Sequence, residues 1–175
     1  MKTSKGLGFG VLLLTFAIAA PLSAQFNTDD PEAFIRGEFR SCQGCDLRGA
    51  NLRNQSHRNA QLRLTDLTGA DLSGANFTGA YFSCSTLRDA NLSGGTFAYA
   101  NFVDANLSGA DLSGADLSKT DLSGAILDET TNLTGTNLDG AKLWDAATIY
   151  RPGMDVSDIT RNTDLESQRV RCRNE

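Results

Sequence analysis

The sequence predicts an all-β solenoid, in which the chain winds repeatedly around one apolar axis in units of five residues. Three observations predict it: Leu or Phe recurs at almost every fifth position, a small residue usually stands two positions earlier, and a Ser-Gly or similar pair often follows. Aromatic residues make up only 7% of the chain, which disfavours a large, aromatic-rich globular core. The recurring residues are Leu47, Leu52, Leu62, Leu67, Leu72, Phe77, Phe82, Leu87, Leu92, Phe97, Phe102, Leu107, Leu112, Leu117, Leu122 and Leu127.

A period of five fits neither regular element, because a helix repeats every 3.6 residues and a strand every 2. Residues two apart on an extended segment point the same way, so Ala110 and Leu112 both face the axis. A turn at Ser113-Gly114 then redirects the chain, and glycine tolerates the backbone angles that tight turns require. Each unit is therefore one short side and one corner, with its Asp or Asn, Ser and Gly facing water.

Residues 40–145, whose unit reads A-(D/N)-L-S-G as in Ala110–Gly114, resemble the pentapeptide-repeat family. The resemblance implies a right-handed quadrilateral β-helix with four units to a coil. Three further centres, Leu133, Leu138 and Leu143, follow a one-residue slip at 128–131. Twenty units then form about five coils, a rod about 24 Å long at the spacing of paired strands. Residues twenty apart stack, which predicts inward ladders that pair Phe77 with Phe97 and Phe82 with Phe102.

The first 24 residues have the layout of a secretory signal peptide. Lys2 and Lys5 precede a fifteen-residue apolar run over 6–20, which Pro21 ends before it reaches the length of a membrane span. We predict cleavage after Ala24, export to the periplasm or another extracytoplasmic or luminal compartment, and no stable membrane anchor afterwards. An uncleaved anchor is the alternative.

The mature chain, residues 25–175, is acidic, with 14 basic and 21 acidic residues. Nucleic acid phosphates are bound through Lys and Arg, so the composition predicts a protein partner and no nucleic acid.

The segments outside the repeat are expected to cover the open ends of the coil. The predicted organisation is a signal peptide (1–24), an N-terminal cap (25–41), the repeat (42–145) and a C-terminal cap or tail (146–175). In the first cap, Asp30-Pro31-Glu32 predicts a helix start. Phe34, Ile35 and Phe39 are expected to face the first coil. A weaker helix is expected over 155–172, after apolar residues that include Trp144.

The chain shows no catalytic residues, no metal ligand set and no cofactor motif, which predicts a protein that is not an enzyme. His57, the single histidine, falls in an inward slot, and a distorted early coil explains it without a function.

Four cysteines, which allow three disulfide pairings, are Cys42, Cys45, Cys84 and Cys172. Cys42-Gln43-Gly44-Cys45 has the spacing of a thiol-redox motif, but both cysteines fall at inward positions. A buried structural pair, reduced or bridged, is favoured over a redox centre.

The outward positions supply the remaining candidates. A ring of four arginines, five residues apart, surrounds the first coil, and three aspartates lie on different sides of the fourth; solvated charge explains both sets. Tyr81, Tyr99 and Val103 replace the usual Asn or Asp, Gly and Ser on one side of the rod, and form a possible partner surface. The charged residues are Arg48, Arg53, Arg58, Arg63, Asp111, Asp116 and Asp121.

Three functions compete. The first is a rigid structural or protein-interaction module outside the cytoplasm. The second follows from the resemblance, because some acidic cytoplasmic members of the family imitate DNA and bind topoisomerases in quinolone protection. The signal peptide and the dispersed acids disfavour it. The third is thiol-redox activity through Cys42 and Cys45.

Overall fold

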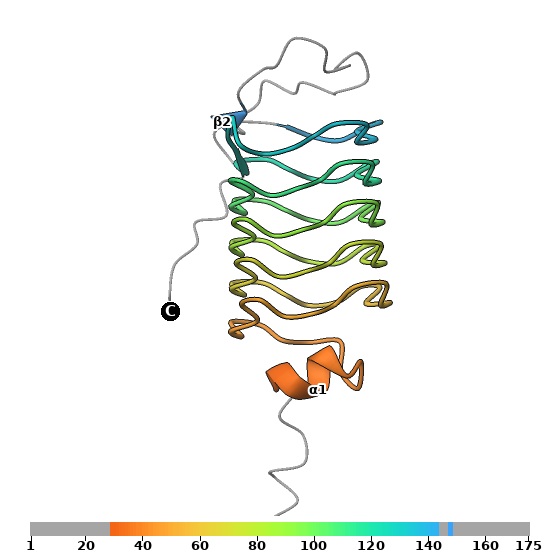
Figure 1. The fold of residues 1–175 in the computed structure, drawn as a ribbon, viewed down its shortest axis with the longest axis vertical. Helices are drawn as coiled ribbons and strands as arrows, with labels where there is room; N and C mark the ends of the chain where they lie inside the picture. Colours follow the sequence, from red (N-terminus) through yellow and green to blue (C-terminus); the bar gives the residue numbers. More distant parts are fainter. Residues whose placement is uncertain (1–28, 144–146, 149–175) are drawn as a thin grey trace, which may run out of the picture.

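The computed structural model describes residues 29–143 and 147–148, the last two by their backbone alone. These residues form a stack of similar turns with one short helix at the N-terminal end (Figure 1). The predicted signal peptide and cleavage site, Trp144 and the expected helix over 155–172 lie outside the described residues.

Successive turns pair in parallel at a fixed separation. Tyr81 pairs with Gln61 on one side and with Asn101 on the other, and the same separation of twenty residues holds from Ser41 to Ile126. One turn therefore takes four five-residue units. From Asp111↔Asn132 onward the separation is twenty-one residues, which confirms the one-residue slip at 128–131.

We call the four five-residue units of a turn its first to fourth sides and identify each by its central residues. The first side has Leu47, Leu67, Leu87, Leu107 and Leu127; the second Leu52, Leu72, Leu92, Leu112 and Leu133; the third His57, Phe77, Phe97, Leu117 and Leu138; the fourth Leu62, Phe82, Phe102, Leu122 and Leu143. In the part of the chain that the structure describes, regular strands occur on the first side at the C-terminal end, where β1 (Ile126–Leu127) pairs in parallel with β2 (Ala147–Thr148).

Each unit satisfies its own backbone and that of its neighbours, as the unit around Leu112 illustrates. The Leu112 N–H donates to the Asn132 carbonyl of the next turn at 2.8 Å, and the Ala115 N–H closes the corner on the Leu112 carbonyl at 3.0 Å. Gly114 occupies the corner with φ +64°, in the left-handed region that suits glycine. The hydrogen bonds between turns and those that close the corners together leave few backbone groups unpaired, as a stable fold requires.

The axis is filled by the predicted inward residues. Ala110, Leu112 and most of their equivalents are buried, and Leu133 and Leu143 near the C-terminal end are partly buried against the same core. The expected ring ladders are present, with centroids 5.7 Å apart for Phe77–Phe97 and 4.8 Å for Phe82–Phe102. These stacked rings fill the core between turns.

The helix α1 (Pro31–Ile35) covers the N-terminal end of the stack (Figure 1). The Asp30 carboxylate accepts hydrogen bonds from the N–H groups of Glu32 and Ala33, as an N-cap does. Phe34 is fully buried against the first turn and Ile35 is partly buried against the same core. The start of the predicted cap helix is confirmed, and the helix is five residues long.

Candidate functional site

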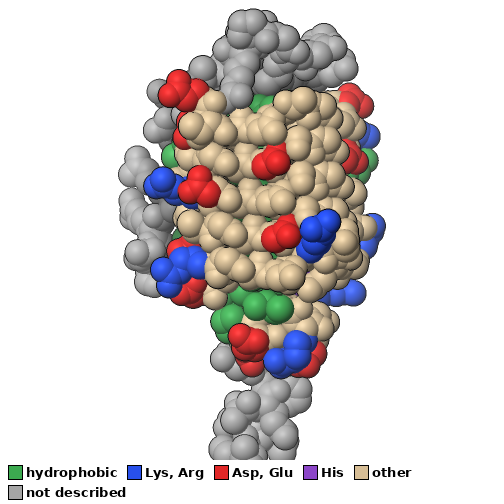
Figure 2. Space-filling view, in the orientation of Figure 1, with side chains coloured by type: hydrophobic (Ala, Val, Ile, Leu, Met, Phe, Trp, Pro, Cys, Tyr) green, Lys and Arg blue, Asp and Glu red, His purple; other side chains and the backbone are tan. Residues whose placement is uncertain are grey.

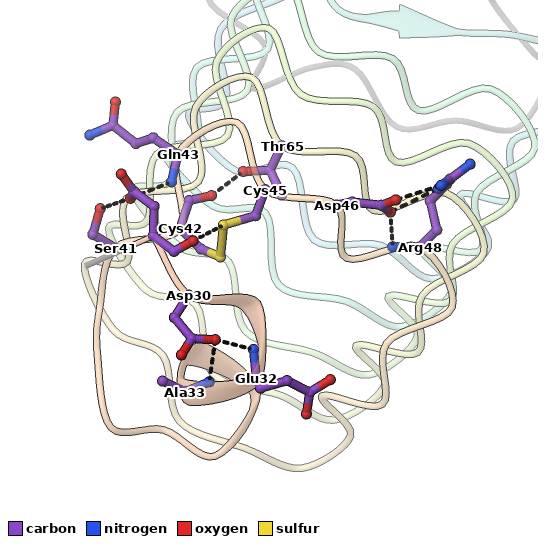
Figure 3. Close-up of a disulfide and its surroundings, with 11 residues drawn as sticks. Asp30, Glu32, Ala33, Ser41, Cys42, Gln43, Cys45, Asp46, Arg48 and Thr65 are labelled. Carbon is purple, nitrogen blue, oxygen red and sulfur yellow. Dashed lines mark hydrogen bonds and ion pairs between the residues drawn. A yellow bond between two sulfur atoms is a disulfide. The ribbon is translucent and has the colours of Figure 1, made fainter. Parts of the chain in front are cut away.

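The cysteines of the Cys-X-X-Cys motif are bridged to each other. The Cα atoms of Cys42 and Cys45 are 5.3 Å apart, and both side chains are buried. The Thr65 hydroxyl donates to the Cys42 carbonyl at 2.7 Å, and the Asp29 carboxylate accepts from the Gln43 N–H at 3.1 Å (Figure 3). The disulfide is therefore enclosed by the fold, whereas reactive cysteines need solvent access.

His57 lies in an aromatic column, in a turn with normal geometry. Its N–H donates to the Asn76 carbonyl at 2.8 Å, and Ser56 pairs with Asn76 in the common register. The expected distortion of this coil is therefore wrong. The ring stacks between Phe34, at 4.6 Å, and Phe77, at 5.2 Å. Its Nε2 lies 2.8 Å from Gln55 Oε1, and this polar partner explains how an imidazole is tolerated at the axis.

Burial lowers the pKa of His57, because desolvation disfavours the imidazolium. The imidazole therefore acts as a filler that connects the cap helix to the Phe77–Phe97 ladder. The buried position offers no space for a substrate beside it, which general acid-base chemistry requires.

The aspartates and asparagines in front of each central Leu are more than solvated charge. The Asp111 carboxylate accepts the N–H of Ser113 at 3.0 Å, and Asp116 and Asp121 accept the N–H groups of Ser118 and Ser123 in the same way. Their side chains are half-buried. The sequence carried a signal for this role, since the position holds Asp or Asn in most units and Glu in none, and the shorter side chains bond the backbone two residues on.

The four arginines of the first turn are exposed, one on each side. The guanidinium of Arg48 donates to the Asp46 carboxylate at 2.8 Å, which lowers the pKa of Asp46 to about 2. Charged side chains are dispersed over the visible face of the rod, with acids and bases intermixed (Figure 2).

Outward apolar side chains gather on and around the fourth side. Tyr81 is 45% exposed, and Val103 lies on the same side in the next turn, half-buried. Tyr99 is 61% exposed at the corner where the third side meets the fourth, with φ +61°. Its hydroxyl accepts a hydrogen bond from Lys119 Nζ at 3.2 Å, and the same ammonium lies 5.3 Å from the ring centroid.

Two further exposed apolar residues were missed at the level of sequence. Leu64, 38% exposed, occupies the corner between the fourth and first sides, and Ile126, 42% exposed, replaces Asp or Asn on the first side. Both stand at positions that the repeat assigns to polar or glycine residues, so the same comparison that selected Tyr81 could have found them. The Val103 side chain is half-buried, like those of Ser93 and Ser113 at the equivalent position of other units.

No three His, Cys, Asp or Glu side chains in residues 29–143 are grouped as a metal site would require. Among the described residues, no helix has the length and apolar character of a membrane span.

The chain matches the family described as "Pentapeptide repeats" in eight copies, over residues 45–83, 85–124 and 105–145. These ranges cover more than half of the chain, and the protein therefore belongs to the pentapeptide-repeat family, whose members are β-helical solenoids. No curated protein matches it.

Several solved structures are similar. A pentapeptide repeat protein from the Arabidopsis thaliana thylakoid lumen is 27% identical, with 65% of this chain and 72% of that chain covered and a TM-score of 0.43. Rfr23 from the cyanobacterium Cyanothece 51142 is 28% identical over 65% of this chain and 98% of its own, with a TM-score of 0.36. QnrB1, a plasmid-mediated fluoroquinolone resistance protein, is 20% identical over 69% of this chain and 76% of its own, with a TM-score of 0.28.

Proposed function

We propose that this pentapeptide-repeat protein is an exported, non-enzymatic rod that acts outside the cytoplasm by presenting its flat sides to a protein partner. The proposal rests on one observation, which is that inward and outward residues of each unit have separate roles. Inward residues fill the axis in the described repeat and leave no interior there for a substrate. Outward residues can change without disturbing the core.

The proposed partner surface is the fourth side, with Tyr81, Tyr99 and Val103. Tyrosine offers a large contact area and a polar hydroxyl at low entropic cost, and interfaces are enriched in it. Neighbouring turns hold Tyr81 and Val103 in place, because Tyr81 pairs with Asn101, whose side chain accepts the Val103 N–H at 3.0 Å. The surface is therefore preorganised, which lowers the entropic cost of binding.

The proposed setting follows from residues 1–24. A charged n-region, a short apolar run and a small residue at position 24 support export and cleavage before Gln25. The intact mass of the exported protein tests this part of the proposal. A mass that begins at Gln25 supports it, and retention of residues 1–24 in a membrane fraction contradicts it.

We also propose the finer description of the fold that the family resemblance implies. The repeat of residues 42–145 winds as a right-handed quadrilateral β-helix of about five coils, between caps at 25–41 and 146–175. The twenty-residue pairing supports four units per coil.

The other two functions have less support. Imitation of DNA needs acids along one side, but Asp111, Asp116 and Asp121 lie on the second, third and fourth sides and bond to their own turns. Thiol-redox activity needs an accessible sulfur, but Cys42 and Cys45 are buried.

A pull-down from the extracytoplasmic fraction tests the partner surface. Tyr81→Asn, Tyr99→Gly and Val103→Ser are combined, which restores the repeat, and circular dichroism checks that the fold is intact. The matched control combines Asn91→Asp, Ser93→Ala and Ser113→Ala on the second side. We expect loss of the recovered partner with the first variant alone. An unchanged partner set with both variants would exclude the fourth side as the binding site.

A further inference from the structure

Cys84 stands at a corner that the repeat reserves for glycine. It lies between the fourth and first sides with φ +59°, and its N–H donates to the Val103 carbonyl of the next turn at 2.9 Å. The side chain is half-buried, in the same corner column as Leu64 and Asp104. Its sulfur is engaged in a disulfide.

The partner of Cys84 follows by elimination. Cys42 and Cys45 are bonded to each other, and the chain has only four cysteines. We infer that Cys84 pairs with Cys172, and that this disulfide latches the C-terminal segment, residues 149–175, along the edge where the fourth and first sides meet.

The chain is long enough for this latch. The pairings Thr86↔Asn106, Asn106↔Ile126 and Ile126↔Ala147 place the described C-terminal end three turns beyond Cys84. Three turns correspond to about 14 Å along the axis. The 24 residues from Thr148 to Cys172 span up to about 80 Å when extended, so they reach Cys84 without strain.

The edge is suited to a covering segment. Leu64 shares the corner column with Cys84, and Ile126 stands two residues beyond that column near the C-terminal end; both are exposed apolar side chains. The covering segment carries apolar residues of its own, among them Ile149, Tyr150 and Val170. Burying exposed apolar surface on both partners favours the contact.

Charge also favours the C-terminal segment as the one that covers this edge. Arg171 and Arg173 flank Cys172 in the sequence, and Asp104 lies one turn from Cys84 in the corner column. Tyr99, 61% exposed, lies on the opposite corner of the fourth side from Cys84.

Formation of the latch is a thiol–disulfide exchange with a disulfide oxidant. The thiols of Cys84 and Cys172 lose two protons and two electrons as the S–S bond between them forms. The oxidant's own S–S bond breaks, and it leaves as two thiols. Export to an oxidising compartment would supply such an oxidant, but the inference does not depend on that setting, because purified protein and oxidised glutathione test it directly.

The first test is peptide mapping, without reduction, of purified protein with its C-terminus intact, refolded with oxidised glutathione. We expect a monomer in which the peptide carrying Cys84 is linked to the peptide carrying Cys172, and a second link between Cys42 and Cys45. A free Cys84 thiol, or a Cys84–Cys84 link between two copies, would overturn the inference.

The second test asks whether the segment lies on the edge. Hydrogen exchange of residues 149–171 is compared between the unaltered protein and Cys172→Ser, with the Cys42→Ala, Cys45→Ala double variant as the matched control. We expect exchange in this segment to rise at least tenfold in Cys172→Ser and to stay unchanged in the control. Equal exchange in the unaltered protein and Cys172→Ser would show that the segment is not latched. A pull-down with Cys172→Ser keeps this result separate from the partner proposal, since Tyr81 and Tyr99 are unchanged in it.

Discussion

The turn of residues 41–60 and the turn of residues 101–120 follow the same path but are stabilised differently. In the later turn, Phe102, Leu107, Leu112 and Leu117 fill the axis, and each Asp or Asn bonds its own corner. The earlier turn contains a disulfide and a histidine, and α1 packs on its outer face. An interior turn is thus stabilised by the repeat alone, whereas the end turn, with one neighbour fewer, uses additional bonds.

The largest expected effect separates inward from outward positions in the regular turn. Leu112→Asp places an unpaired carboxylate on the packed axis, and we expect it to prevent folding, since such a burial costs more than about 4 kcal/mol. Ser113→Asp, one residue later and half-buried at the surface, should change the stability by less than about 1 kcal/mol. Thermal melts followed by circular dichroism compare the two. Equal losses of stability would mean that the inward register is wrong.

The next effect concerns the disulfide of the end turn. Replacing Cys42 and Cys45 with Ala should lower the free energy of unfolding by about 2 kcal/mol, the chain-entropy value for a very short loop. Urea denaturation measures it. An unchanged midpoint would show that the end turn does not depend on the bridge.

A comparable but smaller effect is expected for the corner bond of the regular turn. Asp111→Ala removes the acceptor of the Ser113 N–H and of the Asn132 side-chain amide, and should cost about 1 kcal/mol. Asp111→Asn keeps an oxygen in the same place and is the matched control. If both variants lose equal stability in urea, Asp111 contributes to the free energy of unfolding through its charge and not through the corner hydrogen bond.

The smallest effect is a pH dependence confined to the end turn. The folded protein holds His57 with a lowered pKa, and the unfolded chain has the ordinary value of about 6.5. Between the lowered folded pKa and about pH 6.5, the unfolded state therefore binds more protons than the folded state. The contribution of neutral His57 to the free energy of unfolding is complete above about pH 6.5 and is lost as the pH falls through the folded pKa. His57→Phe, which continues the Phe77 column, should remove this component of the pH dependence. A pH profile of the free energy of unfolding that is identical in both proteins would contradict the assignment.

The repeat architecture could be predicted because five-residue spacing fixes which side chains meet. The inward Leu and Ala residues, the Phe77–Phe97 ladder and the slip at 128–131 were all predicted from spacing and the family resemblance, and all are confirmed. The start of the N-terminal helix was predicted from Asp30-Pro31-Glu32 for a different reason, since capping is a local property of the chain.

What could not be predicted depends on contacts outside the period. Stacking of His57 on Phe34 depends on where the cap helix docks, which no spacing specifies. Spacing alone left the pairing of Cys42 with Cys45 as one of three possibilities. The hydrogen bonds between the half-buried aspartates and their corners could have been predicted, because the preference for Asp and Asn over longer acids was present in the sequence.

Each twenty-residue turn is a module whose stability comes from its own units and its two neighbours. The most direct test duplicates residues 101–120 after Thr120, which adds one complete turn in register. We predict a folded protein with a higher free energy of unfolding and a longest dimension, from small-angle scattering, about 5 Å greater. Insertion of only eighteen of these residues, which breaks the register, should destabilise the rod. Unfolding after the twenty-residue insertion, or equal stability of the two insertions, would contradict the claim.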